Sequence, residues 1–241
     1  MKVSVILPAA GLGTRMTPGA PEKSGISRKQ FMLLDGSPIL LHTIRKFVVC
    51  PAVTEVIVAL RGEDLEWVKE TLAREKYAKP VRVVEGGETR QHSVEHALAA
   101  LAPDVEIVAV HDAVRPFVDD QTIIRVIEEA ARNGAAIVGI VPVDTVKQVQ
   151  RHQITGTLNR DRLVLAQTPQ VFRADLLREA FRKAREDEFV GTDESSLVER
   201  LEQVNVSVVL GSDRNIKITK PSDIQLAKLF LAEEAEKRKS A

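Results

Sequence analysis

The sequence predicts an α/β protein with a Rossmann-like, mostly parallel sheet flanked by helices. Short runs rich in Val and Ile alternate along the chain with longer segments whose apolar residues recur at helical spacing. Strands that alternate with helices form parallel sheets, because each crossover lays a helix over one face. The first run ends in Ala9-Ala10-Gly11-Leu12-Gly13, where small residues let backbone N–H groups come close to a ligand.

Composition narrows the class of protein. The chain has 241 residues, 44% of them hydrophobic, which is enough for one sizeable core. Lys plus Arg equals Asp plus Glu at 34 each, so we expect no nucleic-acid partner and no membrane surface. The single cysteine, Cys50, excludes an internal disulfide and a cysteine-rich zinc site. Because no apolar run is long enough to span a bilayer, we expect a soluble, cytoplasmic protein.

The first half of the chain carries the repeat of strands and helices. Strands are expected at residues 3–7, 55–60, 81–85, 105–110 and 135–141, and the first two of them are expected to be buried. Helices are expected at 38–47, 63–77, 90–101 and 120–133, the first with Pro38 in its first turn. Ligands of such sheets bind beyond the carboxyl ends of the strands. Segments 10–15, 86–90 and 111–115 should therefore meet along one rim.

Cations follow the first strand closely. Arg15, Lys23, Arg28 and Lys29 come after the glycine-containing turn. Backbone N–H groups and cations together form a cradle for an anion, here a nucleotide triphosphate. The stretch lacks the third glycine of a dinucleotide fingerprint and the Gly-Lys-Ser/Thr of a P-loop. An ordinary strand-to-helix turn is therefore one alternative, and a secretory signal is a weaker one.

The second half begins with an interruption at residues 142–167. Polar alternation there predicts a hairpin with strands near 145–151 and 155–158. An isolated hairpin is marginally stable, so this arm should pack against a second copy of the chain; a floppy surface loop is the alternative. Beyond the arm the chain should return to the domain at 168–172. Helices are expected at 174–186 and from Thr192 or Asp193 to 202, and short strands at 206–210 and 216–219. A last helix should begin at Pro221 and have a frayed, charged end. We therefore expect one domain, residues 1–241, with an inserted arm.

Along nearly its full length the sequence resembles the nucleotidyltransferase family that makes CDP-activated sugar alcohols. The matching blocks are PAAGLGTRM at 8–16, RKQF at 28–31, GGETR at 86–90, HDAVRP at 111–116, PVDT at 142–145, QTPQ at 167–170, TDE at 192–194 and NIKIT at 215–219. They are most similar to the branch whose acceptor is 2-C-methyl-D-erythritol 4-phosphate. The alternatives are the branch that uses ribitol 5-phosphate and, more remotely, a non-catalytic nucleotide-binding module. Residues 17–25 are longer than the usual family loop, which leaves the path of this loop and the role of Lys23 open.

The resemblance implies a reaction in which a phosphate oxygen of the acceptor attacks the α-phosphorus of CTP and pyrophosphate leaves. That oxygen is already ionised near neutral pH, so no protein nucleophile or base is required. In-line positioning and compensation of the growing charge are required instead. The resemblance assigns Arg15 and Lys29 to the triphosphate and Lys217 to the α-phosphate. For Arg15 and Lys29 the alternative is a solvated loop cation.

The resemblance assigns further residues to the site. Those around CTP are Pro8, Ala9, Ala10, Gly11, Gly13, Gly87 and Ser93. Those around the sugar-alcohol phosphate are Asp112, Arg115, Thr168 and Thr192, with Thr145 and Arg160 reaching in from the arm of a second subunit. Asp112 is also expected to bind Mg²⁺ together with phosphate oxygens, because a hard carboxylate ligand suits that ion.

Structural alternatives stay open at several of these positions. Asp112 could cap the next turn or pair with Arg115, and Ser93 could simply begin a helix. Thr168 and Thr192 could be caps. His111 is expected to be a hydrogen-bonded histidine at a strand end rather than a ligand or a base.

Overall fold

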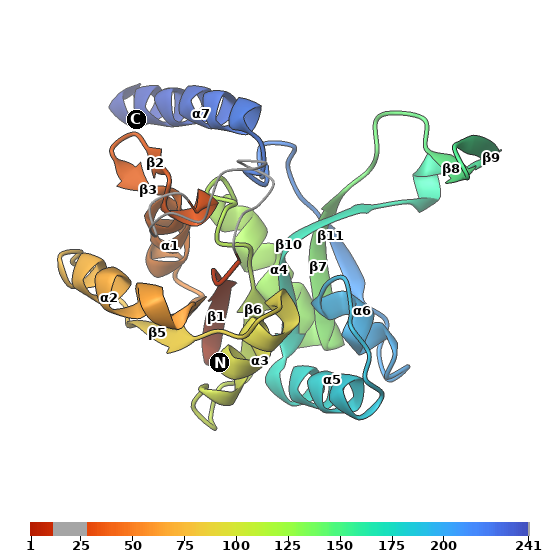
Figure 1. Ribbon diagram of the computed structural model, residues 1–241, viewed down its shortest axis with the longest axis horizontal. Helices are drawn as coiled ribbons and strands as arrows, with labels where there is room; N and C mark the ends of the chain where they lie inside the picture. Colours follow the sequence, from red (N-terminus) through yellow and green to blue (C-terminus); the bar gives the residue numbers. More distant parts are fainter. Residues whose placement is uncertain (12–27, 241) are drawn as a thin grey trace.

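A seven-stranded sheet forms the centre of the computed structural model, which describes residues 1–11 and 28–240 (Figure 1). Its strands are β1 (Val3–Pro8), β4 (Glu55–Leu60), β5 (Val81–Glu85), β6 (Ile107–Val110), β7 (Ala135–Ile140), β10 (Leu165–Arg173) and β11 (Ser207–Leu210). Their order in space is β11-β7-β10-β6-β1-β4-β5. Six strands run parallel, and β10 is antiparallel to both of its neighbours. The expected mostly parallel α/β fold is confirmed.

Helices cover both faces of the sheet because side chains alternate along each strand. Val5 and Leu7 of β1 point into one core and Ile6 points into the other. The first core is closed by α1 (Ile39–Val49), α2 (Leu65–Ala73) and α4 (Asp120–Asn133). The second is closed by α3 (Arg90–Ala99), α5 (Ala174–Glu186) and α6 (Glu194–Glu199). The inner strands β1, β4, β6 and β7 are therefore buried on both faces, as their continuous apolar runs predict, whereas the edge strands β5 and β11 are partly exposed.

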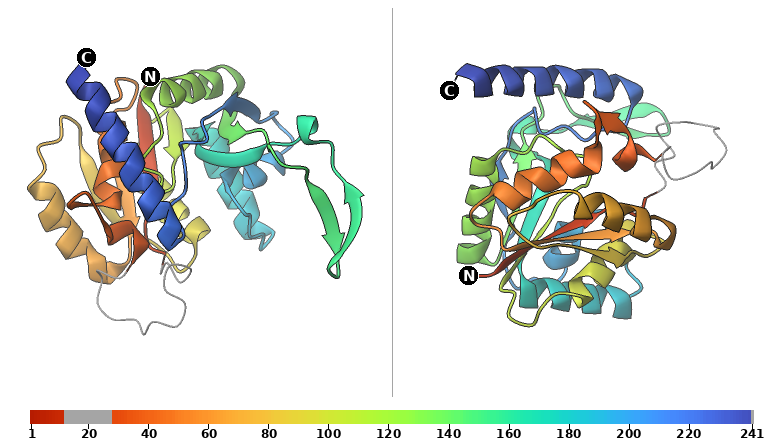
Figure 2. Two further views of the ribbon diagram at one scale, coloured as in Figure 1. Left: turned by 90° about the horizontal axis from the view of Figure 1, so that it is seen from above. Right: turned by 90° about the vertical axis from the view of Figure 1, so that its left-hand side faces the viewer.

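A third, smaller core holds the C-terminal helix α7 (Pro221–Ser240), which lies along one side of the domain (Figure 2). It packs over the short hairpin formed by β2 (Leu33–Leu34) and β3 (Ser37–Pro38). Phe230 of α7 meets Phe117 edge to face, with ring centroids 5.4 Å apart. Val114 and Ile218 belong to the same cluster, so this core fixes the two segments that carry Asp112 and Lys217. In the part of the chain that the structure describes, no helix is long and apolar enough to cross a membrane.

Several boundaries differ from those predicted. The expected strand at 216–219 is an extended segment without a ladder; its Ile218 N–H donates one bond to the carbonyl of Val114, at 3.0 Å. The helix expected from 63 begins as a 3-10 turn, η3 (Gly62–Asp64), and α2 ends at Ala73 rather than at 77. The sequence did not predict the β2–β3 hairpin, the cis peptide bond between Thr168 and Pro169, or the antiparallel direction of β10.

The last two helices begin where the sequence predicts. Helix α6 ends at Glu199 instead of reaching 202, and its N-cap is Asp193, whose carboxylate accepts from the Ser196 N–H. Helix α7 extends to Ser240 and includes the charged residues at 233–239, whose fraying stays a prediction.

The predicted arm is confirmed as a β-hairpin that extends away from the sheet (Figures 1 and 2). Its strands are β8 (Lys147–Gln150) and β9 (Gln153–Thr157), followed by a 3-10 turn, η4 (Arg160–Arg162). Apolar side chains on it face solvent: Val143 is 86% exposed, Val149 57% and Ile154 65%. Within one chain these side chains have little to pack against.

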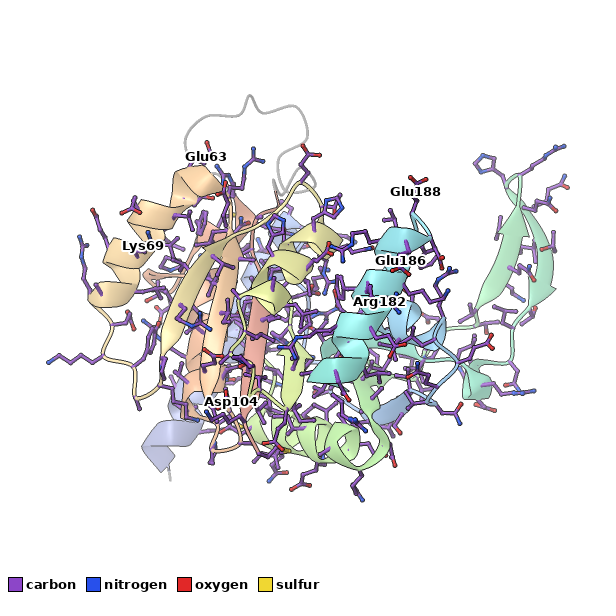
Figure 3. All side chains as sticks on the ribbon, turned by 90° about the horizontal axis from the view of Figure 1, so that it is seen from below. Glu63, Lys69, Asp104, Arg182, Glu186 and Glu188 are labelled. Carbon is purple, nitrogen blue, oxygen red and sulfur yellow. The ribbon has the colours of Figure 1, made fainter. Side chains whose placement is uncertain are left out.

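The two ends of the sheet carry different kinds of segment. Glu63, which follows β4, and Asp104, which precedes β6, lie at opposite ends of the domain in Figure 3. At the Glu63 end the chain leaves β1, β5 and β6 through residues 9–11, 86–90 and 111–115. These turns meet along one rim, where they line a common pocket. The prediction is thus confirmed for segments 86–90 and 111–115 and for the described residues of segment 10–15.

His111 fastens the turn after β6 to β10. It is fully buried, and its ring lies edge to face against Phe47 at 4.8 Å. Its Nε2 lies 3.0 Å from the carbonyl oxygen of Arg115, so Nε2 is the donor. Nδ1 then accepts from the hydroxyl of Thr168, at 3.1 Å, and that hydroxyl accepts from the Asp112 N–H, at 3.0 Å. The prediction of a hydrogen-bonded strand-end histidine is confirmed.

This network makes stability depend on pH. Burial lowers the pKa of His111 from its ordinary 6.5 to about 4, although the Arg115 carbonyl acts in the other direction. Between these values the unfolded chain binds the proton and the folded chain does not. The free energy of unfolding should therefore fall by about 3 kcal/mol from this group as the pH drops from 6.5 to 4.

Denaturant unfolding of His111→Gln at several pH values between 7 and 4 tests this expectation. The variant should lose the part of the slope that His111 contributes, whatever its stability at pH 7, while the part from His42, whose pKa is also lowered by burial, should remain. His152→Gln, an exposed change on the arm, is the control for removing one histidine. An unchanged slope in His111→Gln would contradict the assignment.

Candidate active site

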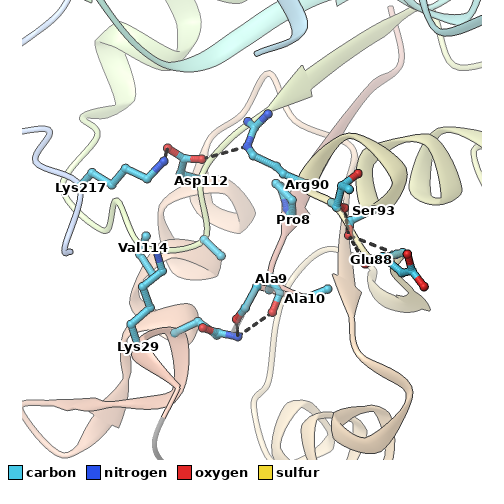
Figure 4. Close-up of a pocket in the computed structure, with 15 residues that line it drawn as sticks. Pro8, Ala9, Ala10, Lys29, Glu88, Arg90, Ser93, Asp112, Val114 and Lys217 are labelled. Atoms are coloured by element: carbon cyan, nitrogen blue, oxygen red, sulfur yellow. Dashed lines mark hydrogen bonds and ion pairs between the residues drawn. The ribbon is translucent and has the colours of Figure 1, made fainter. Parts of the chain in front are cut away.

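The pocket at this rim has a volume of about 250 Å³ and joins segments that are far apart in the sequence (Figure 4). The turn after β1 and the 3-10 turn η2 (Lys29–Phe31) form one wall. The turn after β5, the start of α3 and the turn after β6 complete it, with Lys217 at the edge. Its lining residues are Pro8, Ala9, Ala10, Gly11, Lys29, Gln30, Gly87, Glu88, Thr89, Arg90, Ser93, Asp112, Ala113, Val114 and Lys217.

The turn after β1 is held by a buried glutamine. Gln30 Nε2 donates to the carbonyl oxygens of Ala9, at 2.7 Å, and of Gly11, at 3.1 Å. The Ala9 N–H donates to the carbonyl of Ala59 at 2.8 Å. Both backbone groups of Ala9 are thus used within the protein, and Ala10 and Gly11 remain as the nearer candidates for ligand contact. Gly13 and Arg15, and also Lys23, lie outside the described residues.

The second wall depends on close packing at Gly86. A Cβ at this position would lie 2.9 Å from both the Ala10 Cβ and the Ser93 Oγ. The Ser93 hydroxyl accepts from the Gly87 N–H at 3.2 Å and donates to the Thr89 carbonyl at 2.8 Å. Ser93 does not cap α3, because Thr89 does so by accepting from the His92 N–H. Ser93 therefore braces the glycine turn from inside the pocket wall.

Asp112 is the charged centre of the pocket (Figure 4). Its Oδ2 lies 2.9 Å from Lys217 Nζ and 3.1 Å from Arg115 Nε, and its Oδ1 lies 3.4 Å from Arg90 Nε. Burial raises the pKa of this carboxyl, but the three cations outweigh burial, and the pKa lies below its ordinary value. Asp112 is therefore ionised throughout the physiological range and keeps three cations at one point.

Arg28 differs from its predicted role in the anion cradle. Its guanidinium is almost buried and pairs with Asp64 and Glu63. Arg28 thereby ties η2 to η3, and its two neighbours Lys29 and Gln30 line the pocket in its place.

Five predicted acceptor-binding residues do not line this pocket. Arg115 is held by Asp112 and by the carbonyl of Asn215, at 2.7 Å, and Thr168 is buried in the His111 network. Thr145 and Arg160 are exposed on the arm, where Arg160 donates to the Val143 carbonyl. Thr192 is also exposed, and it lies just before the cap of α6 rather than serving as the cap.

Sequence reasoning gave no role to three residues that organise the pocket. Gln30 holds the first turn, Arg90 pairs with Asp112, and Glu194 accepts from Arg90 Nη1 at 2.7 Å. Arg90 follows a recognisable cap at Thr89, and Glu194 follows one at Asp193. The two caps were the signal in the sequence that Arg90 and Glu194 are the first residues of helices.

A resident metal site is not built by the described residues. No group of three His, Cys, Asp or Glu side chains that could hold an ion occurs among them. Both oxygens of Asp112 are already engaged by cations. One carboxylate suffices, however, for an Mg²⁺ ion that takes its other ligands from phosphates and water.

Comparison with known proteins identifies the family of this chain. The family described as 2-C-methyl-D-erythritol 4-phosphate cytidylyltransferase matches residues 3–233. A protein of that name from Solibacter usitatus is 64% identical over 239 residues, covering 98% of each chain. One from Acidobacterium capsulatum is 50% identical over 236 residues, covering 96% of this chain and 98% of its own.

A solved structure shows the same fold. The 4-diphosphocytidyl-2C-methyl-D-erythritol synthase of Anaerococcus prevotii superposes with a TM-score of 0.83 at 31% identity, covering 96% of both chains. The chain therefore belongs to the 2-C-methyl-D-erythritol 4-phosphate cytidylyltransferase family, which are nucleotidyltransferase enzymes.

Proposed function

We propose that the pocket transfers the cytidylyl group of CTP to 2-C-methyl-D-erythritol 4-phosphate and releases pyrophosphate in isoprenoid biosynthesis. The observation that carries this proposal is the meeting of a glycine-lined turn, Lys29, Asp112 and Lys217 in one cavity of a chain that belongs to this family. We also propose a cytoplasmic location, in keeping with the one cysteine, Cys50, which is free and buried.

The nucleotide base fits the closely packed end of the pocket. Pro8, Ala10 and Gly11 form one side there, and Gly87 braced by Ser93 forms the other. Gly86 brings the two sides together, so the space suits a small pyrimidine better than a purine. In this arrangement Ser93 selects the base by fixing the shape of the turn around it.

The triphosphate fits the cationic end. Lys29 and Lys217 line the pocket on either side of Val114, and Arg15 of the adjoining loop is proposed to join them. Attack on the α-phosphorus adds negative charge to five-coordinate phosphorus, and fixed cations stabilise that charge without reorganisation. The attacking oxygen belongs to the acceptor phosphate and needs no base. The chain's own contribution is alignment and charge compensation.

We propose that Mg²⁺ enters with the triphosphate and that Asp112 is the residue that would hold or orient it. When bound, the ion supplies further charge neutralisation at the phosphates. Lys217 can leave Asp112 for a phosphate oxygen because the carboxylate retains Arg90 and Arg115. Arg115 and Thr168 keep Asp112 in place from behind, and Thr192 remains a proposed contact of the acceptor.

The arm is proposed to complete the site of a second copy in a homodimer. Its exposed apolar side chains, Val149 and Ile154 among them, need a partner surface. Thr145 and Arg160 do not line the pocket of their own chain. In a dimer they would grip the acceptor phosphate in the neighbouring pocket.

The substrate assignment predicts a selective reaction. Mixing the protein with CTP, Mg²⁺ and 2-C-methyl-D-erythritol 4-phosphate should release pyrophosphate. The rate should be at least tenfold higher than when ribitol 5-phosphate replaces the acceptor or ATP replaces CTP. The reason is that a poorly matched substrate loses polar contacts worth more than about 1.4 kcal/mol. Chelation of Mg²⁺ should stop the reaction. Equal rates with the two acceptors would favour the ribitol branch, and no pyrophosphate with any acceptor would favour a nucleotide-binding module.

Lys217→Ala should lower kcat by about 10²- to 10³-fold, because it removes a cation from the reacting phosphorus. Lys220→Ala is the matched control, since Lys220 is exposed in the same segment and does not line the pocket. Steady-state pyrophosphate release measures both. Turnover of Lys217→Ala within twofold of the control would remove Lys217 from the mechanism.

Sharing of sites between subunits predicts complementation. Chains carrying Lys29→Ala and chains carrying Arg160→Ala should each be weakly active, yet after mixing and exchange they should regain about one quarter of wild-type activity, because half of the dimers then hold one intact site of two.

The control is a mixture of Lys29→Ala and Lys217→Ala chains. Both residues lie in the pocket of one chain, so no intact site can form. Recovery in the control, or none in the Arg160 mixture, would argue against a shared site.

A further inference from the structure

Glu194 is a buried carboxylate behind the pocket wall. It is the first residue of α6 and only 1% exposed. Its Oε1 accepts from Arg90 Nη1 at 2.7 Å, while its Oε2 has no hydrogen-bond partner among the residues that the structure describes. A buried acidic side chain is costly unless it is paired, so the Arg90 contact is its main compensation.

Arg90 connects Glu194 to the reacting end of the pocket. It is the first residue of α3, lines the pocket, and has a side chain that is about one-third exposed. It bridges two carboxylates from other elements: Glu194, at 2.7 Å, and Asp112, at 3.4 Å. The shorter contact is the stronger one, and the longer one lies at the limit of a hydrogen bond. The orientation of the guanidinium is therefore set from the Glu194 side.

The position of Glu194 is itself fixed. The side-chain amide of Gln170 donates to Asp193 at 2.7 Å and accepts from the Ser195 N–H at 3.0 Å, which ties the start of α6 to β10. Gln91, next to Arg90, accepts from the Gly191 N–H at 3.0 Å and so ties the start of α3 to the segment before α6. Two helix starts are thus joined on either side of the Arg90–Glu194 pair, with little freedom to shift.

We propose that Glu194 is a positioning residue for the transfer reaction. Its ion pair with Arg90 prevents Arg90 from binding Asp112 more closely. Lys217 therefore keeps its place beside Asp112, from which it can reach the phosphates. The proposal rests on the proposed function of the pocket. Asp112 is shared by three cations. An Arg90 guanidinium released from Glu194 can therefore donate from two of its nitrogens to Asp112 and displace Lys217 from the carboxylate. The effect reaches the reacting centre and leaves the base-binding end of the pocket unchanged.

Glu194→Gln keeps the shape of the side chain and removes its charge. It should lower kcat by about 10- to 100-fold, the scale expected when a reacting group is displaced by an ångström or less, with the KM for CTP changing less than about threefold. A role in stability alone would leave kcat of the folded fraction unchanged. Glu194→Asp, which retains the charge, should recover part of the loss. Glu199→Gln, exposed at the other end of α6, is the matched control and should behave as wild type.

A double-mutant cycle shows whether Glu194 acts through Arg90. The kcat of Arg90→Ala combined with Glu194→Gln should be no lower than that of Arg90→Ala alone. Losses that multiply, or a kcat of Glu194→Gln equal to that of Glu199→Gln, would overturn the proposal.

A readout without turnover separates this inference from the proposed function. The ¹⁵Nε–H NMR resonance of Arg90, assigned by its loss in Arg90→Lys, should be sharp in the wild type and in Glu199→Gln and should shift and broaden in Glu194→Gln. If the wild type releases no pyrophosphate from CTP with any acceptor, the function fails, and the resonance alone then decides whether Glu194 orients Arg90. An Arg90 resonance that is identical in Glu194→Gln overturns the positioning role.

Discussion

The pocket depends on one buried carboxylate that is shared among three cations. Asp112 is buried, yet Arg90, Arg115 and Lys217 keep it ionised. Asp112 and Glu194, the second partner of Arg90, carry two negative charges against these three positive ones, so a positive surplus remains that attracts an anion. Removal of Asp112 would leave cations repelling each other in a partly buried space. The site therefore attracts phosphate while its cations remain ordered before any ligand arrives.

Strand β10 holds Asp112 and its cations in place. It is antiparallel to both β6 and β7, and its residues bond to the turn after β6 and to the Lys217 segment. The bulge of β10 between Ala166 and Gln170 lies beside the end of β6, where Thr168 accepts from the Asp112 N–H. Asn215 donates to the Thr168 carbonyl at 2.9 Å and its own carbonyl accepts from Arg115. Gln170 meanwhile fixes the start of α6. One short piece of chain thus joins the turn, the Lys217 segment and the Glu194 helix, and explains why these distant sequence blocks meet.

The sequence predicts most of the sheet, because buried parallel strands are continuous apolar runs bounded by turns. It also places Ala10, Gly87 and Asp112 at one rim, because each of them follows the carboxyl end of a predicted parallel strand. It does not predict the direction of β10, because antiparallel pairing there is decided by contacts with β6 and β7 and not by local pattern. It also misses Gln30, whose amide looks like any surface polar group until the fold brings the Ala9 carbonyl to it. The wrong role for Arg28 has the same origin: Asp64, its partner, is distant in sequence.

Lys217 shows why an extended segment suits this site better than the strand that its alternating neighbours predict. In a ladder its backbone would be paired along its whole length. Here the Ile218 N–H is tied to the Val114 carbonyl and the Ile216 N–H turns back to the Arg214 carbonyl, and Ile218 itself is anchored in the core beneath α7. The lysine side chain therefore has a fixed base, and in the proposed reaction it would exchange the Asp112 carboxylate for a phosphate oxygen. Exchange between acceptors of like charge costs little reorganisation, which is what fast charge compensation at phosphorus requires.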